Sequence, residues 1–177
     1  NGDGVIQNHK EAFKWYRLAA EQGNVDAQIS LGAMYENGEG IIQDDKLAFK
    51  WYHLAAEQGD EIAQLNLGWM YYEGIGVIQD YQEAVKWYHL SADQGDADAQ
   101  TDLGLMYARG KGVTQDYKEA VKWYRLAAEQ GYAAAQYNLG LMYQLGKGVL
   151  QDYKTAGNWW KLAAEQGSAD AQFNLGL

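Results

Sequence analysis

Apolar residues recur along this chain with the period of an α-helix. In one stretch Ala84, Trp87, Tyr88, Ser91 and Ala92 stand at i, i+3, i+4, i+7 and i+8. This spacing puts them on a single stripe of a helix, while the residues between them are mostly polar. The pattern therefore predicts an amphipathic helix that buries this stripe.

The residues around the stretch mark both ends of the predicted helix. Asp80 stands where an N-cap belongs, and Glu83 completes a capping box with it. Asp116 and Glu119 repeat the same arrangement further along the chain. Gly95 follows the last turn, where a left-handed residue usually ends a helix.

A second stripe follows, with Ala99, Leu103, Met106 and Tyr107 at i, i+4, i+7 and i+8. It predicts a second helix, which Gly104 interrupts. A glycine inside a helix costs about 1 kcal/mol relative to alanine. We interpret Gly104 as the mark of a close approach by another helix, where no larger side chain fits.

Both helices recur at intervals of 36 residues without an insertion. The tryptophan series is Trp15, Trp51, Trp87, Trp123 and Trp159, and the glutamine series is Gln28, Gln64, Gln100, Gln136 and Gln172. Neither helix can bury its stripe alone, so consecutive units must stack on one another. We expect Trp, Tyr, Leu and Met to supply the core, with most of the tryptophans in it, and the glutamines to make a structural hydrogen bond rather than bind a ligand.

A glycine pair such as Gly74 and Gly76 lies between the two helices of each unit. Glycine pairs cradle phosphate when they follow a strand and point to a helix N-terminus. No strand is predicted here and the pair recurs in every unit. A tight turn therefore explains the pair better than a phosphate site does.

The spaced motifs Ala48 to Gly59, Ala63 to Tyr71 and Gly74 to Asp80 together resemble the Sel-one-like repeat of the tetratricopeptide (TPR) superfamily. The resemblance extends over the whole chain. It implies an all-α, right-handed α/α solenoid (superhelix) of five 36-residue helix-turn-helix repeats, which is TPR-like. It also implies an adaptor for other proteins, with the helix that begins near Ala63 lining a concave groove.

We expect one array over residues 1–177. Its helix pairs are predicted at 8–43, 44–79, 80–115, 116–151 and, incomplete, 152–177. The chain starts inside an inter-helix loop and shows no polar capping repeat, which solenoids normally need. We therefore expect it to be a fragment of a longer array, or to stack through its uncapped ends. The close likeness of the copies fits a recent duplication or a designed sequence.

Composition narrows the kinds of partner. The chain has 14 Lys and Arg against 24 Asp and Glu, a net charge of -10. This balance disfavours nucleic acid and anionic lipid, which both require clustered basic residues, and favours a basic or neutral protein. No stretch is long enough to insert into a membrane. The compartment is not determined, although the resemblance leans to a bacterial, periplasmic or secreted protein.

No residue set predicts catalysis, a metal site or a cofactor. His53 and His89 share one repeat position, where we interpret them as part of a solvated basic row. Asp93, Asp96 and Asp98 lack the spacing and the glycine of a calcium loop. Some cysteine-rich relatives are described as penicillin-binding or β-lactamase-like. The chain has no cysteine, which weakens this hydrolase alternative.

The outward face of the second helix is where we predict partner binding. Its residues vary most between copies and are apolar or aromatic where a solvated face would be charged. In TPR relatives an asparagine placed like Asn66 or Asn138 bonds the backbone of a bound peptide. The predicted partner-binding residues are Ile29, Ile62, Leu65, Asn66, Trp69, Tyr72, Thr101, Leu105, Arg109, Tyr137, Asn138 and Leu141.

Two other interpretations stay open for these residues. They cover one another if the superhelix is tightly curved, and then no partner surface exists. Alternatively, the chain is a structural array that associates with itself through its open ends.

Overall fold

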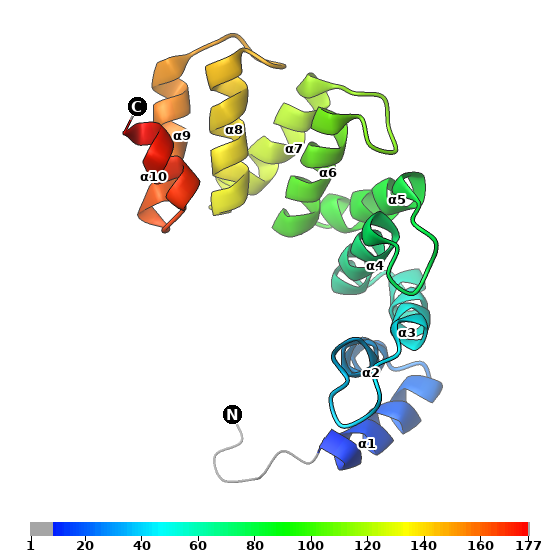
Figure 1. Ribbon diagram of the computed structural model, residues 1–177. Coiled ribbons are helices and arrows are strands. Elements are labelled where there is room, and N and C mark those ends of the chain that lie inside the picture. The colour runs from blue at the N-terminus through cyan, green and yellow to red at the C-terminus, as the bar shows by residue number, and fades with distance from the viewer. Residues whose placement is uncertain (1–8, 177) are drawn as a thin grey trace. The chain divides into compact units, whose positions relative to one another are not determined.

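A computed structural model describes residues 9–176 of the chain (Figure 1), and this part contains ten α-helices and no strand. The chain divides into two compact units, unit 1 (residues 1–80) and unit 2 (residues 81–177). Unit 1 contains α1 (His9–Glu21), α2 (Val25–Asn37), α3 (Asp45–Glu57) and α4 (Glu61–Glu73). Unit 2 contains α5 (Tyr81–Asp93), α6 (Ala97–Arg109), α7 (Tyr117–Glu129), α8 (Ala133–Leu145), α9 (Tyr153–Glu165) and α10 (Ala169–Leu175).

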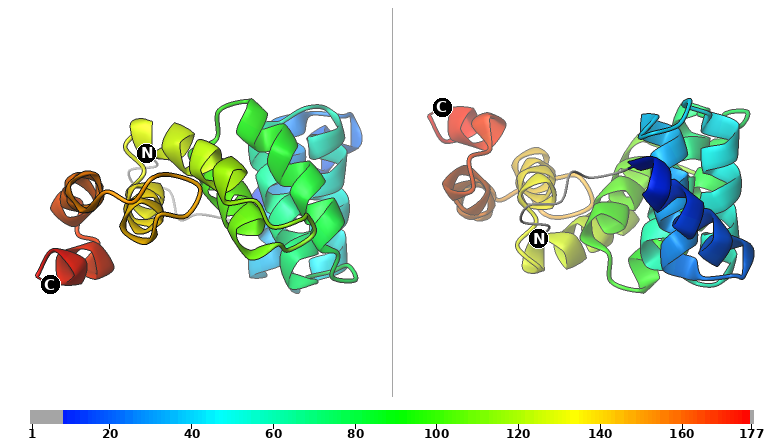
Figure 2. Two further views of the ribbon diagram at one scale, coloured as in Figure 1. Left: turned by 90° about the horizontal axis from the view of Figure 1, so that it is seen from above. Right: turned by 90° about the horizontal axis from the view of Figure 1, so that it is seen from below.

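Within each unit every helix packs against the next one in the chain, as the two views of Figure 2 show for α5 to α10. This is the stacking of an all-α solenoid, and the expectation of helix pairs in 36-residue repeats is confirmed. The predicted stripes fall within α5 and α6. None of the helices in residues 9–176 has the length and apolar character needed to cross a membrane.

Side chains cap most of the helices as the sequence predicts. Asp116 accepts hydrogen bonds from the backbone N–H groups of Lys118 and Glu119 at the start of α7. Asp96 accepts one from Ala99 at the start of α6. Tyr132 precedes α8 and makes no such bond through its side chain. Each cap satisfies one or two of the backbone N–H groups that have no partner within the helix.

The prediction that the tryptophans belong mostly to the core is only partly right. Trp123 is buried, but Trp15 is 63% exposed and Trp51, Trp87 and Trp159 are half-buried. The position one residue later is buried more consistently, and it holds Tyr52, Tyr88, Tyr124 and Trp160. One residue turns a helix by about 100°, and this turn directs Tyr52, Tyr124 and Trp160 at the preceding repeat.

These rings explain the glycines at Gly32, Gly104 and Gly140 in the preceding second helices. A Cβ added to Gly104 would lie 2.7 Å from Cδ1 of Tyr124, and one added to Gly140 would lie 2.4 Å from Nε1 of Trp160. The predicted close approach is therefore confirmed. The group that makes it is an aromatic side chain of the next repeat.

The glutamine series makes the structural hydrogen bond that the sequence predicts. The buried Gln100 donates from Nε2 to the carbonyl of Ala92, 3.1 Å away, and the buried Gln136 donates to Ala128 at 3.2 Å. Their Oε1 atoms accept from Gln130 at 2.9 Å and from Gln166 at 2.9 Å, respectively. Each glutamine thus joins the two helices of its own repeat and links that repeat to the next.

Candidate partner-binding site

The outward face of α4 carries a partly exposed apolar stripe. Ile62, Leu65, Trp69 and Tyr72 follow one another at helical spacing, so their side chains share one side of the helix. Ile62 is 50% exposed and Trp69 is 38% exposed, whereas Leu65 and Tyr72 are half-buried. Asn66 is half-buried beside them. We call Ile62, Leu65, Trp69 and Tyr72 the α4 stripe.

The corresponding face of α2 makes more packing contacts with neighbouring helices. Ile29 packs against the buried cluster of Ala48, Tyr52 and Met70. The Tyr52 hydroxyl donates a hydrogen bond to Oε2 of Glu36 at 2.7 Å. Burial, followed by this bond and the Glu36 charge, raises the pKa of Tyr52. Ile29 therefore serves mainly as packing between α2 and α3.

In unit 2 the predicted partner-binding residues of α6 differ in their exposure to solvent. Thr101 is only 8% exposed and donates its hydroxyl to the Ala97 carbonyl at 2.7 Å, so it offers little to a partner. Leu105 is half-buried and Arg109 is exposed. Burial raises the pKa of Tyr124, and the nearby charge of Arg109 opposes this change.

The predicted residues of α8 surround Trp160. Tyr137 and Leu141 are half-buried against the cluster that contains Trp160, whose Nε1 donates to the Tyr137 carbonyl at 3.2 Å. Asn138 is half-buried as well. Phe173, which is 68% exposed, was missed by the sequence analysis. Its position is that of Tyr137 one repeat later, and this register could have identified it.

A carboxylate with an unusual environment lies on α6. Asp102 is half-buried, and this burial, together with the charge of Asp98, raises its pKa to about 6. A hydrogen bond from the Tyr88 hydroxyl works in the opposite direction. Burial also raises the pKa of Asp98, which accepts a hydrogen bond from the Tyr132 hydroxyl.

An Asp102→Asn variant is expected to be more stable than the parent at pH 7.5 by about 1–3 kcal/mol. Asp102 in the folded chain binds its proton more tightly than in the unfolded chain. The protonated Asp102 carboxyl therefore contributes its full stabilisation below about pH 4, and this stabilisation is lost as the pH rises through about 6.

Urea unfolding at pH 4 and pH 7.5 checks this expectation. Asn66 and Asn138 hold the same repeat position, so asparagine is compatible with the local fold. An equal difference between parent and variant at both pH values would contradict it.

The expectation of a solvated basic row is wrong for His89. The ring is half-buried and packs edge-on against Trp123 with 5.2 Å between ring centroids. Its Nε2 lies 3.2 Å from the Tyr107 hydroxyl. His53 is closer to the expectation, because it makes a 3.6 Å ion pair with Glu57 on the same helix. Within residues 9–176 no three acidic or histidine side chains are grouped to hold a metal ion.

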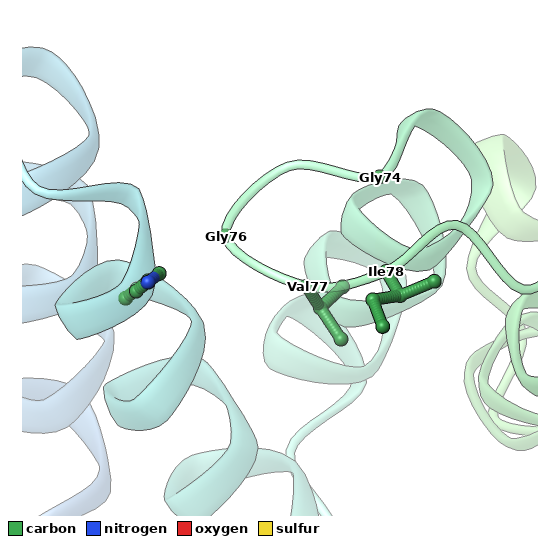
Figure 3. Close-up of a pocket in the computed structure, with 5 residues that line it drawn as sticks. Gly74, Gly76, Val77 and Ile78 are labelled. Atoms are coloured by element: carbon green, nitrogen blue, oxygen red, sulfur yellow. The ribbon is translucent and has the colours of Figure 1, made fainter.

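The loop after α4 forms a shallow hollow, which Figure 3 shows with Gly74, Gly76, Val77 and Ile78 around it and which Lys46 also lines. A Cβ on Gly76 would lie 2.1 Å from the Asp45 carbonyl oxygen. The glycine is therefore required for the loop to pack on the start of α3. This contact favours the expected tight turn rather than a phosphate site.

The fold and its repeated motifs define a TPR-like helical repeat protein. The chain belongs to the Sel1 repeat family, whose model matches residues 1–24, 25–60, 62–96, 97–132 and 133–168. Sel1 repeats typically build non-catalytic scaffolds that bind other proteins. The sequence has no match among curated proteins.

Several solved structures share this fold. A Sel1 repeat protein from Oxalobacter formigenes is 43% identical, with a TM-score of 0.90 over 99% of this chain and 71% of that one. The protective antigen c5321 of uropathogenic Escherichia coli is 38% identical, with a TM-score of 0.71 over 99% of this chain and 45% of that one. Cysteine rich protein B of Helicobacter pylori is 27% identical, with a TM-score of 0.58 over 76% of this chain and 97% of that one.

Proposed function

We propose that this chain is a non-catalytic scaffold that holds a peptide or protein segment of a partner against the outward faces of its second helices. The observation that carries the proposal is the α4 stripe, where Ile62 is 50% and Trp69 is 38% exposed. Exposed apolar stripes of this kind mark interaction surfaces, and tryptophan and tyrosine contribute disproportionately to binding energy.

The surroundings of the stripe suit the recognition of an extended segment. Asn66 is half-buried at its edge, and its amide has both a donor and an acceptor for a peptide backbone. Family resemblance assigns this role to asparagine in TPR relatives. Asn138, Leu105 and Arg109 provide corresponding contacts in unit 2, which we treat as a separate binding surface.

Replacement of Leu65, Trp69 and Tyr72 by alanine is expected to weaken partner binding by at least about 30-fold, because hot-spot residues contribute about 2 kcal/mol or more. Peptides selected against the parent chain from a displayed random library supply the ligands. Fluorescence polarisation then compares the affinities of parent and variant.

An Ile42→Ala, Ile78→Ala variant is the matched control. Both side chains belong to inter-helix loops of unit 1 and are 90% and 88% exposed, so their removal deletes accessible apolar surface that is not part of the α4 stripe. The control is expected to bind like the parent. Unchanged binding by the triple variant, with cooperative melting retained, would refute the proposal for α4.

A self-associating array is the second candidate. Trp15 is 63% and Tyr16 is 40% exposed on α1, whereas Tyr52 and Tyr124, which share the repeat position of Tyr16, are buried. A mass in solution that rises with concentration, and that falls when Trp15 and Tyr16 are replaced, would favour this candidate.

A further inference from the structure

Charge is unevenly distributed among the helices of unit 1. The basic and histidine side chains of residues 9–80 all lie on α1 and α3, namely His9, Lys10, Lys14, Arg17, Lys46, Lys50 and His53. Neither α2 nor α4 contains Lys, Arg or His. These two helices instead carry Asp26, Glu36, Glu61 and Glu73. The helix with the α4 stripe is therefore purely acidic.

Within the described residues, no basic side chain of α1 or α3 forms an ion pair with an acidic residue of α4. Arg17 pairs with Glu21 at 3.6 Å and His53 with Glu57 at 3.6 Å, each on its own helix. Glu61 and Glu73 are exposed, and within the described residues no cationic side chain lies within 4.0 Å of either. Their charges are available to a partner.

Glu61 and Glu73 flank the α4 stripe at its two ends. Glu61 is adjacent to Ile62 and one turn before Leu65, and Glu73 is adjacent to Tyr72 and one turn after Trp69. At about 100° per residue the two carboxylates lie on opposite sides of the stripe. Twelve residues of helix separate them by about 18 Å.

The end of α4 reinforces the acidic character near Tyr72. The C-terminus of a helix carries a partial negative charge, which lysine or arginine in the last turn usually offsets. The last turn of α4 has no basic residue and ends at Glu73. A cation from outside the chain would interact favourably with both the carboxylate and the helix end.

We infer that the α4 stripe binds a cationic protein segment, with its apolar residues on the stripe and a lysine or arginine at each end, beside Glu61 and Glu73. The inference rests on the proposed function and specifies the partner's chemistry. An extended chain covers about 3.3 Å per residue, so cations five residues apart match the separation of the carboxylates. The exposed Trp69 ring offers a further cation–π contact.

Three amidated peptides with identical apolar residues test the inference. Their two positions five residues apart are both Lys, both Gln or both Glu. By fluorescence polarisation on the whole chain in 50 mM NaCl, the Lys peptide is expected to bind at least about ten-fold tighter than the Glu peptide. The preference is expected to shrink in 500 mM NaCl, where exposed charges are screened within about 4 Å.

Charge reversal on α4 locates the effect. A Glu61→Lys, Glu73→Lys variant is expected to reverse the order of the Lys and Glu peptides. A Glu21→Lys, Glu57→Lys variant changes the net charge of unit 1 by the same amount on α1 and α3, and is expected to keep the parent order. Reversal by this control as well would overturn the inference, because net charge alone would then explain the preference.

The two proposals fail in different ways. Equal binding of all three peptides, or no binding of the Lys peptide, overturns the cationic inference. The scaffold proposal still stands in either case if library-selected peptides lose affinity for the triple alanine variant. It fails if that variant binds the selected peptides as the parent does.

Discussion

A Gly112→Ala variant is expected to lose about 2–5 kcal/mol of unfolding free energy, the sum of about 1–2 kcal/mol for the backbone conformation and about 1–3 kcal/mol for overpacking. Gly112 lies in the loop after α6 with a φ of 69°, a conformation that costs an alanine about 1–2 kcal/mol. The added Cβ would also lie 2.2 Å from the carbonyl oxygen and 2.5 Å from the carbonyl carbon of Tyr81. These are backbone atoms of α5, so they cannot rotate away.

Gly131→Ala separates the two penalties. Gly131 has a φ of 92°, but a Cβ placed there meets nothing within 4 Å. This variant is expected to lose only about 1–2 kcal/mol, the conformational cost alone. Urea unfolding followed by circular dichroism compares both variants with the parent. Equal losses in the two variants would show that the contact between loop and α5 contributes nothing to stability.

A Gln136→Glu variant is expected to lose about 3–5 kcal/mol at pH 8, because it buries a carboxylate without a partner cation. Gln136 is 3% exposed, donates from Nε2 to the Ala128 carbonyl at 3.2 Å and accepts from Gln166 at 2.9 Å. The carboxylate could still accept from Gln166. Its second oxygen would face the Ala128 carbonyl, another acceptor.

The pH dependence of this variant follows from the same geometry. Burial raises the pKa of the new carboxyl in the folded state, so the folded chain binds more protons than the unfolded chain. The stability of the variant relative to the parent is therefore highest at low pH, and it falls as the pH rises through the pKa of the carboxyl in the folded state. At pH 4 the protonated carboxyl can donate to Ala128, and the loss relative to the parent is expected to fall to about 1 kcal/mol.

Gln172→Glu is the matched control, since Gln172 makes the corresponding bond to Ala164 at 3.1 Å but is exposed. An exposed carboxylate keeps most of its hydration, so this variant is expected to lose much less stability at pH 8. Urea midpoints of both variants at pH 4 and pH 8 provide the measurement. A loss for Gln136→Glu that does not change with pH would contradict a buried carboxylate.

The candidate site was only partly predictable from sequence. Leu65, Trp69 and Tyr72 could be placed on the outward face of α4 because helical period alone defines opposite sides of a helix. Thr101 satisfies the same period, yet it is buried and bonded to Ala97. The helical period of the sequence predicts the direction in which a side chain points. Its exposure depends on which residues of the neighbouring helices pack against it. Whether a partner covers these residues stays a prediction.

The sequence by itself determined the helix pairs, their caps, the five repeats and the structural role of Gln136. Each of these depends on local spacing or on one interaction that recurs from repeat to repeat. The tertiary structure alone decided that Tyr124 and Trp160, rather than the tryptophan series, pack on the glycines. It also decided that His89 packs on Trp123 and that burial shifts the pKa of Asp102. These contacts and the burial of Asp102 depend on the angle at which successive repeats stack, and the sequence of a single repeat does not specify that angle.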